Sequence, residues 1–121
     1  MQDRPNVIVD KTFEFALLIV EFAEKLESNK KYVIANQLLK SGTSVGANVR
    51  EAQNAESKAD FIHKMKIAAK EADETEYWLL LCQKSENYPD CEVLQKEVKE
   101  IVKILSKIIA SSKNKTLTGS N

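Results

Sequence analysis

The feature that most constrains this chain is the spacing of its apolar residues, which recur every three or four positions through four long segments. This spacing predicts amphipathic helices over residues 11–27, 32–55, 58–84 and 90–112. Short connections place successive helices side by side in opposite directions, so the sequence predicts an all-α fold, an antiparallel up-down-up-down four-helix bundle. The third segment keeps the bundle spacing most strictly, at Phe61, Met65, Ala68, Ala72, Thr75, Leu79 and Cys82.

A single domain is expected, because 121 residues suffice for one hydrophobic core and no internal repeat is visible. The bundle should occupy residues 10–112, between an N-terminal tail of residues 1–9 and a polar C-terminal tail of residues 113–121. Asp10 is the expected N-cap of the first helix. Pro89 is expected in the first turn of the fourth helix, where its missing N–H is tolerated.

The first segment carries two apolar stripes at helical spacing, one with Phe13, Ala16, Leu17, Val20 and Ala23 and one with Phe15, Leu18, Ile19, Phe22 and Leu26. The second stripe makes the apolar face wider than one core requires, and residues 77–82 of the third segment are apolar on every side. A monomer exposing these residues together would carry an apolar patch of the size that marks an interface. We therefore expect a homo-oligomer, most simply a cyclic ring, with candidate interface residues Phe15, Phe22, Trp78 and Leu80.

Two glycines, Gly42 and Gly46, lie four residues apart inside the second predicted helix. Each glycine in a helix interior costs about 1 kcal/mol relative to alanine. A helix that keeps two glycines on one side is expected to pack closely against a neighbouring helix there. The alternative is that the glycines open a space for a ligand.

Charge and composition limit the classes of function. Lysine plus arginine equal aspartate plus glutamate at 18 each, which argues against a dedicated nucleic-acid binder but allows a local basic patch. No secretory signal and no membrane-spanning run is visible, so no membrane association is expected. Cys82 and Cys91 are too few for a zinc site or a disulfide framework, and reduced thiols and a cytoplasmic location are expected.

Neither a catalytic site nor a metal site is expected. Asp60 and His63 have the spacing of one half of a di-iron motif, but this is the chain's single histidine, so the second half is missing. Ser41 and Ser44 lack the strand-to-helix turn of a nucleophile elbow. No glycine-rich phosphate loop is present, and no cofactor is expected. The sequence therefore predicts a protein that is not an enzyme.

Polar residues of the second and third predicted helices form a candidate cluster between helices or between subunits. Its members are Ser44, Asn48, Arg50, Glu51, Glu71 and Glu74. Residues three or four apart share one helix face, so such a cluster can form if the two helices are antiparallel neighbours. The alternatives are a small binding site, a network that fixes helix register, and a solvated salt-bridge face that contributes little to stability.

A lysine stripe follows one side of the fourth predicted helix, and it is the candidate contact for RNA or DNA. The stripe consists of Lys96, Lys99, Lys103 and Lys107. Glu92, Glu97 and Glu100 dilute its charge. The alternative is therefore an ordinary solvated face of mixed charge.

Residues 37–52 (QLLKSGTSVGANVREA) and 60–79 (DFIHKMKIAAKEADETEYWL) carry a family resemblance. They resemble the second-helix and third-helix signatures of the bacterial four-helix bundle protein family. Some members are encoded in intervening sequences of ribosomal RNA genes and are labelled ribosomal-protein-like. The accessory variability determinant of diversity-generating retroelements is similar too. The resemblance implies an antiparallel bundle, a ring with the pentamer as the best-known form, and no catalytic activity.

The retroelement relatives bind nucleic acid and a reverse transcriptase through a strongly basic surface, from which this neutral chain departs. The expected function is a non-enzymatic oligomeric scaffold that organises a nucleic acid or a nucleic-acid enzyme. The alternative is a protein-binding or self-assembly module without a nucleic-acid role.

Overall fold

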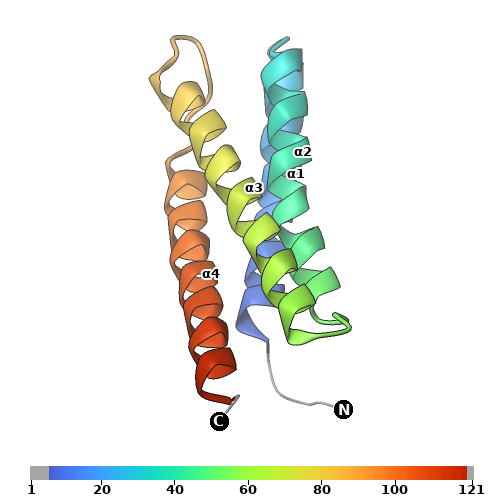
Figure 1. Ribbon diagram of the computed structural model, residues 1–121. Coiled ribbons are helices and arrows are strands. Elements are labelled where there is room, and N and C mark those ends of the chain that lie inside the picture. The colour runs from blue at the N-terminus through green and yellow to red at the C-terminus, as the bar shows by residue number, and fades with distance from the viewer. Residues whose placement is uncertain (1–5, 120–121) are drawn as a thin grey trace.

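The computed structural model describes the backbone of residues 6–119 and the side chains of residues 6–114. It contains four helices, α1 (Val7–Ser28), α2 (Tyr32–Ala52), α3 (Lys58–Lys84) and α4 (Glu92–Gly119). Each helix runs opposite to the one before it (Figure 1). Each also packs against its neighbours in the chain, and α4 makes a smaller contact with α1. The predicted all-α four-helix bundle is confirmed.

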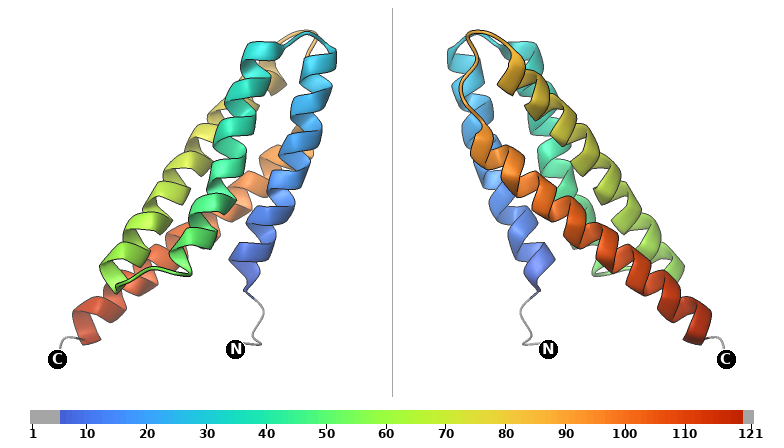
Figure 2. Two further views of the ribbon diagram at one scale, coloured as in Figure 1. Left: turned by 90° about the vertical axis from the view of Figure 1, so that its right-hand side faces the viewer. Right: turned by 90° about the vertical axis from the view of Figure 1, so that its left-hand side faces the viewer.

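The bundle is tighter at one end than at the other. Both turned views show α1 and α4 diverging toward the end where the two termini lie (Figure 2). The contact between α1 and α4 includes a bridge in which Lys11 Nζ lies 3.1 Å from Glu97 Oε1 and 3.0 Å from Glu100 Oε1. Because α1 diverges from α4, the start of α3 and the last turns of α4 pack together at this end without α1 between them (Figure 2).

The helix ends differ from the predictions at several places. Asn6, not Asp10, is the N-cap of α1, because its side chain accepts a hydrogen bond from the Val9 N–H at 3.4 Å. The helix α2 ends at Ala52, three residues earlier than predicted. The third helix has the predicted bounds, and Ser57 Oγ caps it by accepting from the Asp60 N–H at 3.0 Å.

The fourth helix is displaced at both ends. It begins at Glu92, after Pro89, so the prediction that Pro89 lies in its first turn is wrong. Asp90 accepts a hydrogen bond from the Glu92 N–H at 3.3 Å instead. It continues to Gly119, so residues 113–119, predicted to be a tail, continue the helix. Residues 1–5 and 120–121 of the predicted tails lie outside the described residues.

The core draws on one stripe of each helix. The α3 seam is buried from Met65 to Cys82, and only Phe61 at its start is partly exposed. A buried hydrogen bond joins α3 to α2, in which Thr75 Oγ1 donates to Ser41 Oγ at 2.9 Å. The largest fully buried side chains include Phe15, Ile19, Leu26, Leu38, Met65, Leu79, Ile101 and Leu105.

Candidate functional site

The two glycines of α2 face α1. A Cβ placed on Gly42 would lie 2.8 Å from Ile19 Cγ1, and a Cβ placed on Gly46 would lie 3.2 Å from the Thr12 carbonyl oxygen. Both distances are shorter than ordinary van der Waals contacts, because α1 approaches α2 closely along this line. Gly42 is fully covered, and Gly46 lies at the rim of a shallow hollow.

An apolar surface remains uncovered where α1 and α2 lie side by side. On α1, Phe13 is 52% exposed and Leu17 is 51% exposed, and Val20 continues the same side. Leu39 adds to it from α2. A hollow of about 190 Å³ lies within it, lined by Val9, Phe13, Ala16, Thr43, Gly46, Ala47 and Arg50. We call Phe13, Leu17, Val20, Leu39 and this hollow the α1–α2 apolar surface.

Only some of the predicted interface residues lie at the surface. Phe15 and Phe22 are 1% and 6% exposed and belong to the core, so the prediction is wrong for both. The large exposed residues of α1 at the α1–α2 apolar surface are Phe13, Leu17 and Val20, which belong to the other apolar stripe. Both stripes are apolar, so periodicity alone could not tell which one α2 and α4 would cover.

The other two predicted interface residues lie on α3. Trp78 is partly buried, and its Nε1 donates a hydrogen bond to Glu74 Oε2 at 3.1 Å. Leu80 is 47% exposed beside Tyr77 and Leu81, which are also exposed. Tyr77, Leu80 and Leu81 form a second apolar area, on α3, which is separate from the α1–α2 apolar surface.

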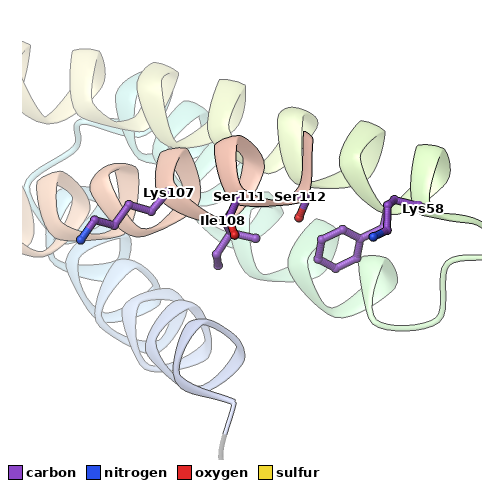
Figure 3. A pocket seen from close by; sticks show the side chains of 6 residues that line it. Lys58, Lys107, Ile108, Ser111 and Ser112 are labelled. Carbon is purple, nitrogen blue, oxygen red and sulfur yellow. The ribbon is translucent and has the colours of Figure 1, made fainter. Parts of the chain in front are cut away.

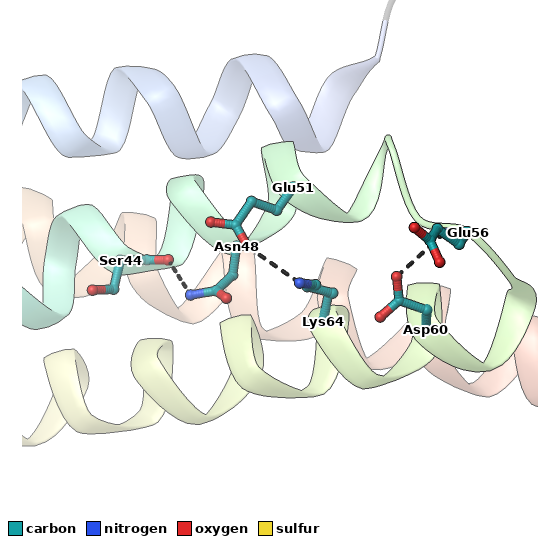
Figure 4. Close-up of polar contacts among 6 residues, drawn as sticks. All are labelled: Ser44, Asn48, Glu51, Glu56, Asp60 and Lys64. Carbon is teal, nitrogen blue, oxygen red and sulfur yellow. Dashed lines mark hydrogen bonds and ion pairs between the residues drawn. The ribbon is translucent and has the colours of Figure 1, made fainter.

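The predicted polar cluster does not form one network. Ser44 Oγ donates to the Lys40 carbonyl, and Asn48 Nδ2 donates to the Ser44 carbonyl at 2.9 Å, so both bonds stay within α2 (Figure 4). Glu51 reaches α3 through Lys64, with Oε1 and Nζ 3.4 Å apart. Among the described residues, no hydrogen bond or ion pair joins the members on α2 to Glu71 or Glu74.

Arg50, the remaining member of that cluster, turns toward α1 instead of α3. Its guanidinium carbon lies 6.0 Å from the centre of the Phe13 ring. A cation above an aromatic face is a weakly favourable contact in an exposed setting. Arg50 is therefore part of the α1–α2 apolar surface, where it supplies a charge at one edge.

The lysine stripe of α4 is only partly available for a partner. Lys99 Nζ lies 3.2 Å from Glu76 Oε2, whereas Lys96, Lys103 and Lys107 are exposed. The bridge from Lys11 to Glu97 and Glu100 removes two of the carboxylates that were expected to dilute the stripe. The hydrogen bond from Lys11 lowers the pKa of Glu100, and the same pair of carboxylates raises the pKa of Lys11.

Charge is strongly segregated along the hairpin of α3 and α4. Residues 58–70 and 101–121 together contain eight lysines and one aspartate, a formal charge of +7. Residues 71–100, between them, contain nine acidic residues and three lysines, a formal charge of −6. Because the two helices are antiparallel, the basic segments meet at the end of the bundle that holds the termini (Figure 1). The neutral total therefore conceals a basic end.

The basic end consists of Lys58 and Lys66 on α3 and Lys107 and Lys113 on α4. Within the described part of the chain, none of these four lysines forms an ion pair. A side-chain hydrogen bond with Lys113, together with repulsion between the two ammonium groups, lowers the pKa of Lys66. Two neighbouring cations without a carboxylate between them favour the binding of an anion.

A hollow of about 610 Å³ opens at the basic end, lined by residues from the start of α3 and from the second half of α4. Lys58 comes from the start of α3 and Lys107 from α4, at opposite ends of the hollow (Figure 3). Phe61 and Ile108 supply apolar surface, and Ser111 and Ser112 supply hydroxyl groups. The arrangement combines an aromatic ring, cations and hydroxyls in one open space.

The described side chains show no arrangement typical of catalysis. No group of three or more histidine, cysteine, aspartate or glutamate side chains that could hold a metal ion occurs among them. Asp60 accepts a hydrogen bond from the Glu56 N–H at 3.3 Å. Burial raises the pKa of Cys82 to about 11 and that of Cys91 to about 12, which keeps both thiols protonated and unreactive.

Sequence reasoning noted that Lys113 follows the lysine stripe, but it missed the contribution of Lys58, Phe61 and Lys66 from α3. A count of charge by segment would have found the lysines, because their excess is visible without coordinates. Phe61 carried no such signal, because it continues the core spacing of α3 and its partial exposure appears only in the structure. No described helix is both long and apolar enough to cross a lipid bilayer.

Comparisons with known proteins place the chain in a family. The family model described as 23S rRNA-intervening sequence protein matches residues 4–107. A crystal structure of a protein with unknown function from the S23 ribosomal protein family of Bacteroides thetaiotaomicron is 47% identical to this chain. The match covers 84% of this chain and 97% of that one, with a TM-score of 0.81. A comparison with curated proteins gives no match. The sequence-based resemblance is confirmed, and the chain belongs to the 23S rRNA-intervening sequence protein family.

Proposed function

We propose that this protein is a non-catalytic scaffold that assembles with copies of itself through the α1–α2 apolar surface. The observation that carries the proposal is the exposure of Phe13 and Leu17, both more than half uncovered, on one side of α1. Exposed apolar residues that form one continuous area normally mark an interaction site. A second copy is the favoured occupant, because helices with apolar outer faces pack readily against each other.

The shape of this surface supports helix packing. Thr43, Gly46 and Ala47 are small, so they leave the hollow of about 190 Å³ beside Phe13. Such a hollow accepts a side chain from a neighbouring helix, as a ridge fits a groove. Repeated contacts of this kind close into a ring when the rotation between copies permits it. The family resemblance favours a ring of five.

Light scattering coupled to size exclusion tests self-assembly. The wild-type protein should be an oligomer at micromolar concentration, and Leu17→Glu should yield monomers because it places a charge in the apolar contact. Val93→Glu is the matched control, since Val93 is 67% exposed but lies on α4, next to Leu18 and Phe22 and not among the residues of the α1–α2 apolar surface. It should leave the oligomer unchanged, and circular dichroism should show helical folding in both variants.

A monomeric wild-type protein would refute the proposal. Equal dissociation by Leu17→Glu and Val93→Glu would place the contact elsewhere and refute the role of the α1–α2 apolar surface. A third result, in which neither variant dissociates the oligomer, would do the same.

A second candidate function, nucleic-acid binding by the scaffold, is favoured by the segregation of charge. Within the described side chains, residues 58–70 and 101–114 hold seven lysines and one aspartate, a formal charge of +6, and these segments lie toward one end of the bundle. Affinity for phosphates comes largely from such a local excess of positive charge. Assembly of several copies would repeat the basic end, and linked weak contacts raise the apparent affinity by orders of magnitude.

A further inference from the structure

We propose that the hollow at the basic end binds single-stranded nucleic acid, with a base against Phe61 and phosphates beside Lys58 and Lys107. This inference rests on the proposed nucleic-acid role and names the form of nucleic acid and its contact residues. It differs from the lysine stripe of α4, because the contact extends to the start of α3.

The size of the hollow and its lining fit a nucleotide. Its volume of about 610 Å³ lies within the range of sites that bind small molecules and nucleotides. Phe61 and Ile108 supply apolar surface to its lining. Lys58 and Lys107 lie at its two ends (Figure 3). A nucleotide likewise combines an apolar part and a charged part, because its base is flat and apolar on its faces whereas its phosphates are charged.

The aromatic ring favours a single strand over a duplex. Bases in a duplex are stacked on each other, so their faces are not available to Phe61. Proteins that bind single strands without sequence preference combine aromatic rings for stacking with a positive groove that follows the backbone. The basic end supplies both elements.

The surrounding charge supports an extended polyanion. Lys66 on α3 and Lys113 on α4 lie close to each other, on the two helices that line the hollow. Neither lysine forms an ion pair in the described part of the chain. Their mutual repulsion would be relieved by a further phosphate of the same strand. An acidic protein segment would satisfy the lysines as well but would make no use of the exposed side of Phe61, so nucleic acid is the favoured ligand.

The test measures binding of the full-length protein to a fluorescent oligouridine of about 12 nucleotides. Fluorescence anisotropy is followed across a salt series that begins at about 50 mM. The same measurement is repeated with a duplex of equal length and with polyglutamate as a competitor. We expect tighter binding of the single strand than of the duplex, and weak competition by polyglutamate.

Three sets of variants separate the contacts. Phe61→Leu should weaken oligouridine binding by about 5- to 100-fold through loss of stacking, whereas Phe61→Tyr should preserve it. The pair Lys58→Gln/Lys107→Gln should weaken binding and lower the salt slope by about 1.4, since each phosphate contact on a single strand contributes about 0.7. The control pair Lys40→Gln/Lys84→Gln removes the same charge from exposed positions outside the basic end and the lysine stripe, and it should bind as wild type.

The outcomes distinguish this inference from the broader proposal. Equal binding of duplex and single strand, full competition by polyglutamate, or undiminished binding by a folded Phe61→Leu would overturn the single-strand site. The nucleic-acid role would survive if the lysine pair still weakened binding more than its control. No binding at low salt, or equal losses in the two lysine pairs, would overturn both. Melting curves verify that each variant is folded.

Discussion

At the scale of single residues, the contact between Gly42 and Ile19 shows how one missing side chain determines helix packing. Ile19 is fully buried and occupies the space that a Cβ on Gly42 would require. Both residues lie in the α1–α2 contact, which also supports the outer apolar surface. Gly42 therefore allows α1 and α2 to approach closely. It does so although a glycine lowers helix stability by about 1 kcal/mol relative to alanine.

Gly42→Ala should lower the free energy of unfolding by about 1–3 kcal/mol, because the added methyl group overpacks against Ile19. Ile19→Ala alone should also destabilise the fold, by leaving a cavity. The double variant Gly42→Ala/Ile19→Ala should be more stable than the sum of the two effects predicts, since the new methyl group enters that cavity. Urea denaturation of the four proteins measures this coupling. Simple additivity would show that the two side chains do not compete for space.

At the scale of helices, the weakest contact is the one between α1 and α4. The contact includes a polar bridge from Lys11 of α1 to Glu97 and Glu100 of α4. Its members are partly exposed, and salt bridges of this kind contribute modestly to stability. It nevertheless joins the first and last helices, which are the most distant in the chain.

Lys11→Met should lower the melting temperature by about 1–4 °C near neutral pH, whereas Lys40→Met, on α2, should leave it unchanged. Lys11 lowers the pKa of Glu100, so the stabilisation is complete above the carboxyl's ordinary value of 4.5 and is lost as pH falls through the lower folded value. The pKa of Lys11 is raised, so the stabilisation is also lost as pH rises well above 10.5. Melting curves from pH 2 to 8 should therefore converge for wild type and Lys11→Met in acid. A constant difference would contradict the bridge.

At the scale of the whole molecule, a formal net charge of zero hides two opposite halves of the α3–α4 hairpin. The acidic residues 71–100 lie toward the connection between these helices, and the basic residues lie at their other ends. Surfaces of this kind interact with charged partners according to the local and not the total charge. The apolar surface lies on the other hairpin, of α1 and α2, so the proposed self-assembly and the proposed binding of anions would use different helices.

The protein should be retained on a heparin column at pH 7 in low salt despite its neutral total. The Lys58→Gln/Lys107→Gln pair should elute at lower salt than the Lys40→Gln/Lys84→Gln pair, although both variants have the same net charge. Elution at the same salt concentration would mean that the column detects net charge alone. That result would contradict a functional segregation of charge.

Helix existence, helix order and most helix bounds were predictable, because they depend on local periodicity and capping. For example, Ser57 and the seam of α3 predicted residues 58–84 without tertiary information. Asn6 and residues 113–119 were missed because the signals at helix ends are weak and local. The two glycines of α2 indicated a close contact, although only the structure shows that Ile19 and Thr12 of α1 supply it.

The sequence by itself determined four amphipathic helices, their antiparallel order and the excess of lysine in two separate segments. Only the tertiary structure decided which apolar stripe of α1 faces inward, because Phe13 and Phe15 are equally suited to a core and the choice depends on where α2 and α4 lie. It also decided that Lys58 and Lys107 share one hollow, since residues 49 positions apart meet through the packing of two helices. Periodicity describes one helix at a time, whereas a surface is made by several.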